Sequence, residues 1–324
     1  MSTSIYTADN REIKLPVGTD PVDIGVLTTD LRNLTQSVNL VMGAGGLTTS
    51  KTSEIPVAAR NKIWRGKNLG AITQAQLDNI SDGSFKDMYL GDYWTFNVSY
   101  KKNRYLTDSG ATAMPTEASS TTTTGSVTAT IVGFDYYKGL SGNATCPHHV
   151  VVILGEFFRA AMHNPVGTTT TIEKAYMGTT MYTNTLPAIQ DALVAGTTLL
   201  NGHINTDKVW NYLPNSNKSD STTMSYPTSS EVVKTSIFLP TEENICGYPV
   251  RTESPRHYYS VDQAQFPALA YGSGRVSSSA TNRYYGWLRD MHSTSSFADA
   301  SYAGGVGAGG VAYVFDVRPA ICIC

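Results

Sequence analysis

The chain has 324 residues, and its 24 lysine and arginine residues nearly balance its 26 aspartate and glutamate residues, for a formal net charge of −2. This length is sufficient to bury a substantial core. No run of lysine or arginine occurs, so the sequence lacks the positive patch that nucleic acids and anionic membrane surfaces require. Composition therefore excludes nucleic acid as a partner. Abundant glycine, serine, threonine and tyrosine favour a β-rich binding protein over an enzyme.

Targeting segments and cysteines add further expectations. The opening residues contain no positively charged region followed by an apolar one, and nowhere do eighteen apolar residues run together. We therefore expect no signal peptide, no membrane insertion, and synthesis and folding in a cytoplasm.

The four cysteines form no C-x-x-C motif; they are Cys146, Cys246, Cys322 and Cys324. Buried unpaired thiols are the favoured interpretation, with a disulfide or a metal as alternatives.

The first element in chain order is a helix that begins at Asp20-Pro21, with proline at its first helical position. Apolar residues then recur at alternating spacings of three and four until the sequence GAGG at 43–46, namely at Ile24, Leu27, Leu31, Leu34, Val38 and Val41. This heptad pattern predicts a short coiled-coil stem that forms a homo-oligomer, a trimer. The alternative is an amphipathic helix that lies on its own domain. Either way, residues 1–58 form an attachment segment with a linker, and residues 59–324 form the body.

The body alternates short helices, strands and polar loops. We expect helices over 73–83, 185–200 and 241–247, a strand pair over 85–96 that bends at Gly91-Asp92, strands over 127–137, 148–158 and 232–240, and a run of short strands that ends with 311–323. The run over 148–158 is nearly all apolar and is expected to be a central strand. The threonine-rich stretch 108–126 and the polar stretch 214–230 are expected to be surface loops. The predicted fold class is α+β, with few helices in a β framework.

Several motifs occur in a characteristic order between residues 60 and 323. They are Trp64 with Gly66, ISDGSFKDMYLGDYW at 80–94, His148 and His149, Met177, Met181 and Leu186, GHI at 202–204, FLPTEENICG at 238–247, QFPAL at 265–269, YYGWLRD at 284–290 and DVRPAICI at 316–323. In this order the body resembles a domain family widespread in tailed phages and prophages of Gram-positive bacteria. The resemblance implies a virion structural protein, assembled in the cytoplasm of the bacterial host.

The closing portion, concentrated in 230–324, is similar to the C-type-lectin-like fold shared by formylglycine-generating enzymes and retroelement-diversified proteins. In that fold a W-L-R strand and a V-R-P-A strand lie near each other in a small sheet. The resemblance implies that 287–289 and 317–319 belong to the framework. The paired catalytic cysteines of the enzymes have no counterpart, so no enzyme is predicted. A lower-ranked idea is that the face over 282–313 is deliberately diversified.

Tyrosines in the final fifth of the chain stand among serine, glycine, alanine and asparagine, a mixture typical of recognition surfaces. The residues expected to be exposed and to bind a ligand are Tyr284, Tyr285, His292, Phe297 and Tyr302. Arg289 and Arg318 are expected to satisfy loop carbonyls and buried acids. Adjacent His148 and His149 would face opposite ways on a strand, so no metal site is predicted, and no cofactor either.

Together these expectations predict a tail-fibre, tail-tip or head-fibre protein. It would bind a host surface glycan or protein as well as other virion subunits. The competing class is architectural, a capsid decoration or a baseplate component whose loops bind only neighbouring subunits.

Overall fold

The computed structural model describes residues 4–6, 12–14, 55–102, 121–138, 146–155, 157–162, 176, 179–204, 211–212, 232–233, 236–247, 265–271, 286–293, 296–300 and 305–324. The chain separates into two units, Met1–Leu47 and Thr48–Cys324. In the first unit, β1 (Ser4–Tyr6) pairs antiparallel with β2 (Glu12–Lys14). The predicted stem residues Ile24, Leu27, Leu31, Leu34, Val38 and Val41 lie outside the described residues.

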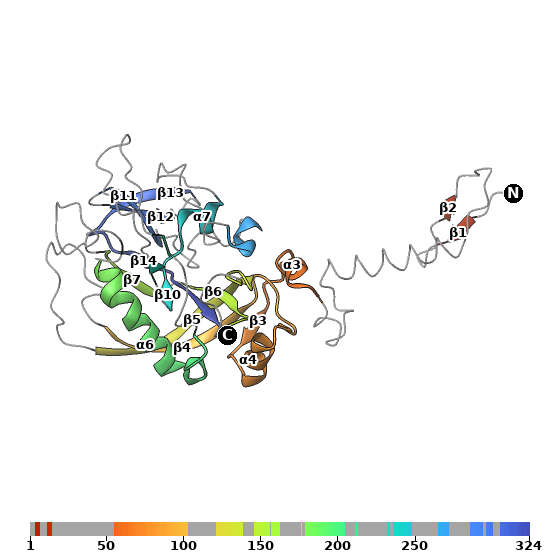
Figure 1. Ribbon diagram of the computed structural model, residues 1–324, viewed down its shortest axis with the longest axis horizontal. Helices are drawn as coiled ribbons and strands as arrows, with labels where there is room; N and C mark the ends of the chain where they lie inside the picture. Colours follow the sequence, from red (N-terminus) through yellow and green to blue (C-terminus); the bar gives the residue numbers. More distant parts are fainter. Residues whose placement is uncertain are drawn as a thin grey trace. The chain divides into compact units, whose positions relative to one another are not determined.

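The second unit, the body, confirms the α+β class, since two sheets carry few helices (Figure 1). The larger sheet has the order β10-β15-β6-β5-β4-β3. Its strands are β3 (Asn68–Gly70), β4 (Tyr93–Lys102), β5 (Thr121–Phe134), β6 (Val150–Leu154), β10 (Ile237–Phe238) and β15 (Ala320–Ile323). All neighbours are antiparallel except β3 and β4. Every residue of β6 is buried, which confirms the predicted central strand.

The smaller sheet has the order β13-β12-β11-β14-β7. Its strands are β7 (Phe158–Ala160), β11 (Gly286–Ser293), β12 (Ser296–Ala300), β13 (Val306–Gly310) and β14 (Phe315–Val317). β11 pairs parallel with β14, so the W-L-R strand and the strand that opens V-R-P-A are neighbours, as predicted. A further pair, β8 (Asn211–Tyr212) and β9 (Val232–Val233), is antiparallel.

One antiparallel ribbon belongs to both sheets. β6 pairs with β15 in the larger sheet, and β7 pairs with β14 in the smaller one. Between the two pairings, Leu154 N donates to Pro319 O at 2.9 Å, which continues the hydrogen bonds across the bend. Gly155 lies at this bend, where a Cβ would come within 2.2 Å of Thr128 Oγ1. Glycine is therefore required for the ribbon to pass against β5.

A disulfide closes one end of the ribbon. It joins Cys146, four residues before β6, to Cys324, which directly follows β15. The expectation of unpaired thiols is therefore wrong for these two cysteines. The pairing escaped prediction because the cysteines are 178 positions apart and only the register of β6 with β15 brings them together. Cys246 and Cys322 are buried and lie outside this disulfide.

Two helices contact the larger sheet. α4 (Gln74–Ser81) begins with the predicted cap, because Thr73 and Gln76 form a capping box. α6 (Leu186–Gly196), preceded by a π-helical turn over Met181–Thr185, packs on β4 (Figure 1). A Cβ at Gly196 would lie 2.4 Å from Asn97 O, so glycine permits this close approach. The remaining helices are α3 (Val57–Arg60) and α7 (Glu242–Cys246).

Two expectations about strands are corrected. Of the strand pair predicted over 85–96 with a bend at Gly91-Asp92, only the second strand forms, as the start of β4 at Tyr93, because the preceding residues turn, with φ of 46° at Phe85 and 52° at Asp87. The loop predicted over 108–126 ends earlier, because Thr121–Phe134 form β5. Threonine is β-branched and suits an extended strand, and β5 pairs with β4 over ten consecutive residues, from Thr121 opposite Lys102 to Thr130 opposite Tyr93.

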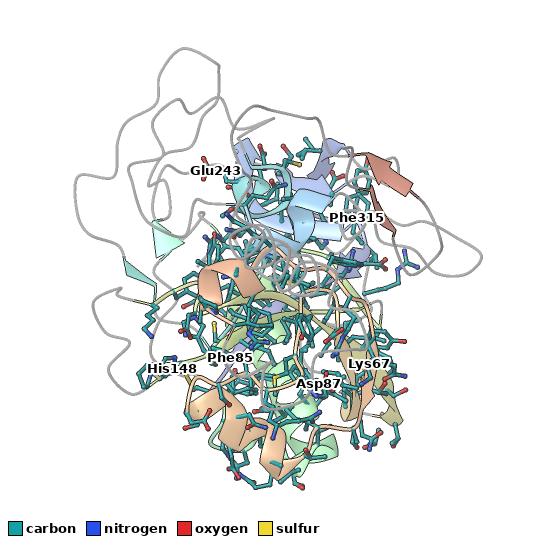
Figure 2. All side chains as sticks on the ribbon, turned by 90° about the vertical axis from the view of Figure 1, so that its right-hand side faces the viewer. Lys67, Phe85, Asp87, His148, Glu243 and Phe315 are labelled. Atoms are coloured by element: carbon teal, nitrogen blue, oxygen red, sulfur yellow. A yellow bond between two sulfur atoms is a disulfide. The ribbon has the colours of Figure 1, made fainter. Side chains whose placement is uncertain are left out.

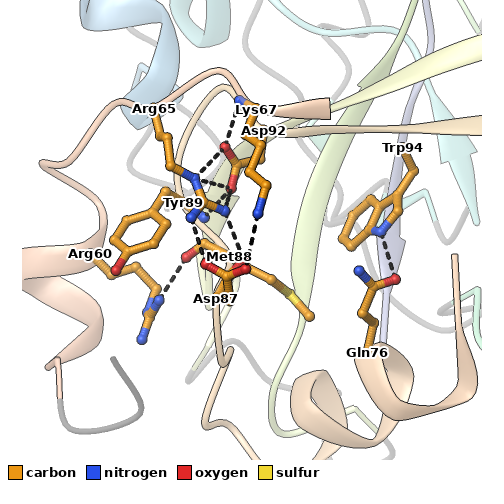
Figure 3. A network of polar contacts seen from close by, with 9 residues as sticks. All are labelled: Arg60, Arg65, Lys67, Gln76, Asp87, Met88, Tyr89, Asp92 and Trp94. Carbon is orange, nitrogen blue, oxygen red and sulfur yellow. Dashed lines mark hydrogen bonds and ion pairs between the residues drawn. The ribbon is translucent and has the colours of Figure 1, made fainter. Parts of the chain in front are cut away.

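A network of charged residues fixes the turn over 85–92 (Figure 3). The carboxylate of Asp92 is fully buried and accepts from Arg65 Nη2 at 2.6 Å and from the backbone of Lys67 and Tyr89 at 2.8 Å each. Arg65 also contacts Asp87 Oδ1 at 2.5 Å and lies over the Tyr89 ring at 4.4 Å. Because every carboxylate oxygen of Asp92 has a partner, its burial is compensated.

Arg60 supports the same turn from the other side. It is fully buried and donates to Met88 O at 2.6 Å and to Ser84 O at 3.2 Å. Figure 3 shows it reaching Met88 beside the Tyr89 ring. Trp94 Nε1 donates to Gln76 Oε1 at 3.0 Å, which ties α4 to the start of β4. These buried groups add to the β-bridge of this turn, in which Leu90 pairs with Trp64.

We expect Asp92→Ala to lower the free energy of unfolding by about 3 kcal/mol, because it leaves the Arg65 guanidinium and two backbone N–H groups without their acceptor. Urea unfolding followed by circular dichroism measures the change. Lys67→Ala is the control, since Lys67 and Asp87 are both about half exposed and their 3.3 Å contact should contribute less than about 1 kcal/mol. Equal losses in the two variants would contradict this account.

Candidate functional site: the Tyr313 surface

The structure tests few of the predicted ligand-binding residues. Tyr284, Tyr285 and Tyr302 lie outside the described residues, and His292 lies in β11. Phe297 is fully buried, so the expectation that it is exposed is wrong. In β12, Phe297 sits opposite Met291 on one side and Gly309 on the other. Its ring belongs to the hydrophobic core of the body, because it is on the face of the sheet that packs inward.

Three aromatic rings instead lead from the core of the smaller sheet to its surface. Trp287 is buried, with 1% of its surface exposed, and its ring centroid lies 4.5 Å from that of Phe315. The Phe315 ring lies 5.9 Å from the ring of Tyr313, which is 61% exposed. Trp287 Nε1 donates to Ala160 O at 2.8 Å, so the innermost ring is also fixed by a hydrogen bond. Because the rings contact one another, each restrains the orientation of its neighbour.

The glycines of β13 make room for these rings. A Cβ at Gly309 would lie 2.3 Å from the Phe315 ring and 3.0 Å from the Trp287 ring. At Gly310 a Cβ would meet the Tyr313 ring at 3.5 Å. Gly309 is therefore needed for packing, since the Phe315 and Trp287 rings occupy the space that its side chain would fill, whereas a Cβ at Gly310 would make only an ordinary contact.

A guanidinium group is hydrogen-bonded to the backbone next to the outermost ring. Arg159, in β7, donates from Nη2 to Val314 O at 3.2 Å. It lies opposite Asp316 in the register of β7 with β14, and its Nε lies 3.4 Å from Asp316 Oδ1, a buried carboxylate, while about half of the Arg159 side chain is exposed. We call the Tyr313 ring and the Phe315 ring beside it the Tyr313 surface; Figure 2 shows Phe315 within the part of the body that contains the smaller sheet. This surface offers an exposed ring face, and the Arg159 charge near it is largely balanced.

A second polar cluster lies where α7 meets β11. Asp290 Oδ2 accepts from the backbone N–H of Glu242 at 2.7 Å, and Arg289 N donates to Pro240 O at 3.1 Å. Glu243 is also buried. Burial raises the pKa of Asp290 and raises that of Glu243 to about 7, although the nearby Arg289 charge opposes both shifts. The contacts of Asp290 and of the Arg289 backbone fasten the FLPTEEN segment to the WLRD strand.

The two adjacent histidines have different environments. His148 Nδ1 lies 2.9 Å from Asp135 Oδ2 and is partly exposed, whereas His149 is fully buried and its Nε2 accepts from Tyr137 N at 2.9 Å. Burial lowers the pKa of His149 to about 4, so its ring is neutral near pH 7. Within the described ranges, no group of three or more histidine, cysteine, aspartate or glutamate residues is arranged to hold a metal ion.

Comparison with known proteins adds no relative: no family model, no curated protein and no solved structure matches this chain. In the part of the chain that the structure describes, no helix combines the length and apolar character needed to cross a membrane.

Sequence reasoning counted Tyr313 among the C-terminal tyrosines but did not select it. The available signal was its position after Gly309-Gly310 and before Phe315, since glycine pairs in a strand indicate that neighbouring rings need the space. Arg159 carried no signal, because its place opposite Asp316 depends on the pairing of β7 with β14. The cluster of Glu243 and Asp290 likewise depends on the contact between α7 and β11.

We expect Glu243 to contribute a fall in stability as pH rises from about 4.5 to about 7, because the folded protein retains a proton on Glu243 that the unfolded chain has already lost. His149 contributes with the opposite sign up to about pH 6.5, because the unfolded chain holds a proton that the buried ring has lost. Glu243→Gln should make the slope of stability against pH less negative by the Glu243 contribution, while the contributions of Asp290 and His149 remain. Urea unfolding at a series of pH values measures it. Asp191→Asn, on the exposed face of α6, is the control and should retain the full slope. An unchanged slope in Glu243→Gln would contradict the assignment.

Proposed function

We propose that this chain is a bacteriophage virion structural protein of the tail-fibre, tail-tip or head-fibre type, which attaches the particle to a host cell. In this proposal the N-terminal unit forms an oligomeric stem, and the body ends in a C-type-lectin-like module. The family resemblance of the sequence motifs supports the virion assignment. The single structural observation that supports a recognition role is the Tyr313 surface, an exposed ring held by two others in a rigid sheet.

The chemistry of this surface suits an uncharged host glycan or a polar protein loop. A tyrosine ring provides contact area at little entropic cost, because few torsions must be fixed on binding. The C–H face of a sugar can stack on such a ring. The ion pair of Arg159 with Asp316 leaves little net charge near the ring. We therefore expect binding that depends weakly on salt.

One observation favours the architectural alternative. β13 is an edge strand of the smaller sheet, and its five residues, VGAGG, contain no charged residue and no proline. Natural edge strands usually carry such residues to prevent pairing with another chain. If β13 were covered by a neighbouring virion subunit, the Tyr313 surface beside it would be a contact between subunits and not a receptor site.

We expect the purified full chain to bind host cells saturably and Tyr313→Ala to weaken that binding by about tenfold or more, a loss typical of a central aromatic contact. Flow cytometry of labelled protein on host cells measures the affinity. Leu199→Ala is the matched control, because Leu199 is also an exposed apolar residue, at 39%, and lies in a different part of the body. If the chain ignores host cells but coats particles that lack it, the architectural alternative is correct.

We expect the double variant Leu31→Asp and Leu34→Asp to convert a trimer into a monomer, because charges in the heptad seam oppose helix association. Light scattering coupled to size-exclusion chromatography measures the mass. The apparent affinity for cells should fall through lost multivalency, while the affinity of each body stays unchanged. Gln36→Asp, outside the seam, is the control. If the wild-type chain proves to be a monomer, the proposed coiled-coil stem is wrong.

A further inference from the structure

The disulfide joins two chain segments at one end of the strand pair β6–β15. Cys146 and Cys324, with Cα atoms 5.6 Å apart, join the chain just before β6 to the chain just after β15. These two strands are paired from Val150 opposite Ile323 to Ile153 opposite Ala320. The disulfide therefore closes the ribbon at the end away from the bend, where strand pairs without a covalent connection fray most easily.

The strand that the disulfide holds has contacts on both sides. β15 pairs with β6 and with β10, and Ile323 forms an additional bridge with Ile204. Just beyond the strand, Cys324 N donates to His203 O at 2.9 Å, and Cys324 O lies 2.7 Å from His203 Nδ1. Release of Cys324 would thus loosen the attachment of several segments to the larger sheet.

We propose that the Cys146–Cys324 disulfide is a redox latch, open while the chain is in a reducing compartment and closed once it reaches an oxidising one. A cytoplasm keeps thiols reduced, so the latch is open after synthesis there. It closes after release and fastens the ribbon shared by the two sheets. The sequence of opening and closing rests on the proposed function, which supplies synthesis in a cytoplasm followed by release, whereas the effect of the disulfide on stability does not.

The closing step is a thiol–disulfide exchange with a low-molecular-weight disulfide as oxidant. Cys324 is partly exposed whereas Cys146 is buried, so the Cys324 thiolate attacks the small disulfide first and releases half of it as a thiol. The Cys146 thiolate then attacks Cys324 Sγ and releases the other half. Two protein thiols lose two protons and two electrons, and the oxidant becomes two thiols.

Thermal unfolding of the full chain with and without dithiothreitol tests the latch. Thiol titration in denaturant should find two thiols per chain before reduction and four after it, since the chain has four cysteines and one disulfide. We expect the reduced protein to unfold at a Tm lower by about 5 °C or more, because a long closed loop restricts the unfolded chain. Cys146→Ser and Cys324→Ser should each match the reduced protein and show no further response to reductant.

A control variant and a hydrogen-exchange measurement distinguish the effect of opening the disulfide from a general effect of the reductant on the protein. Cys246→Ala removes a buried thiol outside the disulfide and should retain the full shift on reduction. Hydrogen exchange should accelerate on reduction in β15 and β10 but not in the β4–β5 pair. The proposal is overturned if the oxidised protein contains four thiols, if full reduction leaves the Tm unchanged, or if exchange accelerates uniformly. The exchange measurement on reduced wild-type protein decides the matter even if a serine variant fails to fold.

Discussion

The ribbon that joins 150–160 to 315–323 is the constraint on which the rest of the body depends. The larger sheet takes one half of it as an inner pair and adds β5 and β10 on either side, whereas the smaller sheet takes the other half at its edge and adds β11 next to β14. A ribbon that enters two sheets must bend without losing its hydrogen bonds, which is why Leu154 bonds to Pro319 and why position 155 is glycine. Every residue of β6 and β15 is buried, and these two strands are wholly apolar, whereas Arg159 of β7 is half exposed.

Irregular segments are held by buried charge where strand pairing is lacking. Asp92 fixes the turn that carries Asp87 at a positive φ, and Asp290 fixes the start of α7 against β11. In the first case an arginine and backbone N–H groups satisfy the carboxylate. In the second, burial outweighs the nearby Arg289, and the pKa is raised. A buried carboxylate thus fixes both segments. The carboxylate of Asp92 has all its hydrogen-bond partners, whereas that of Asp290 has a raised pKa, so its charge depends on pH.

Local patterns predicted local structure well. The cap at Thr73, the helix that became α6 and the buried run of β6 follow from side-chain chemistry within a few residues. The threonines at 121–126 were misassigned because polarity suggested a loop, whereas pairing with β4 selects β-branched residues. Three features could not be predicted: the burial of Phe297, the neighbours of Arg159 and the disulfide partner of Cys324. All three depend on the order of the strands in the sheets, which no local pattern specifies.

Strand order also explains why the Tyr313 surface is rigid. Tyr313 stands two residues before β14, the strand that continues through Arg318 and Pro319 into β15. The exposed ring is thus attached to the ribbon, and Phe315 and Trp287 restrain it from below. A ring fixed before contact loses little freedom on binding, so more of its contact energy remains as affinity. The constraint that joins the sheets therefore also prepares the surface through which, in our proposal, the body meets its partner.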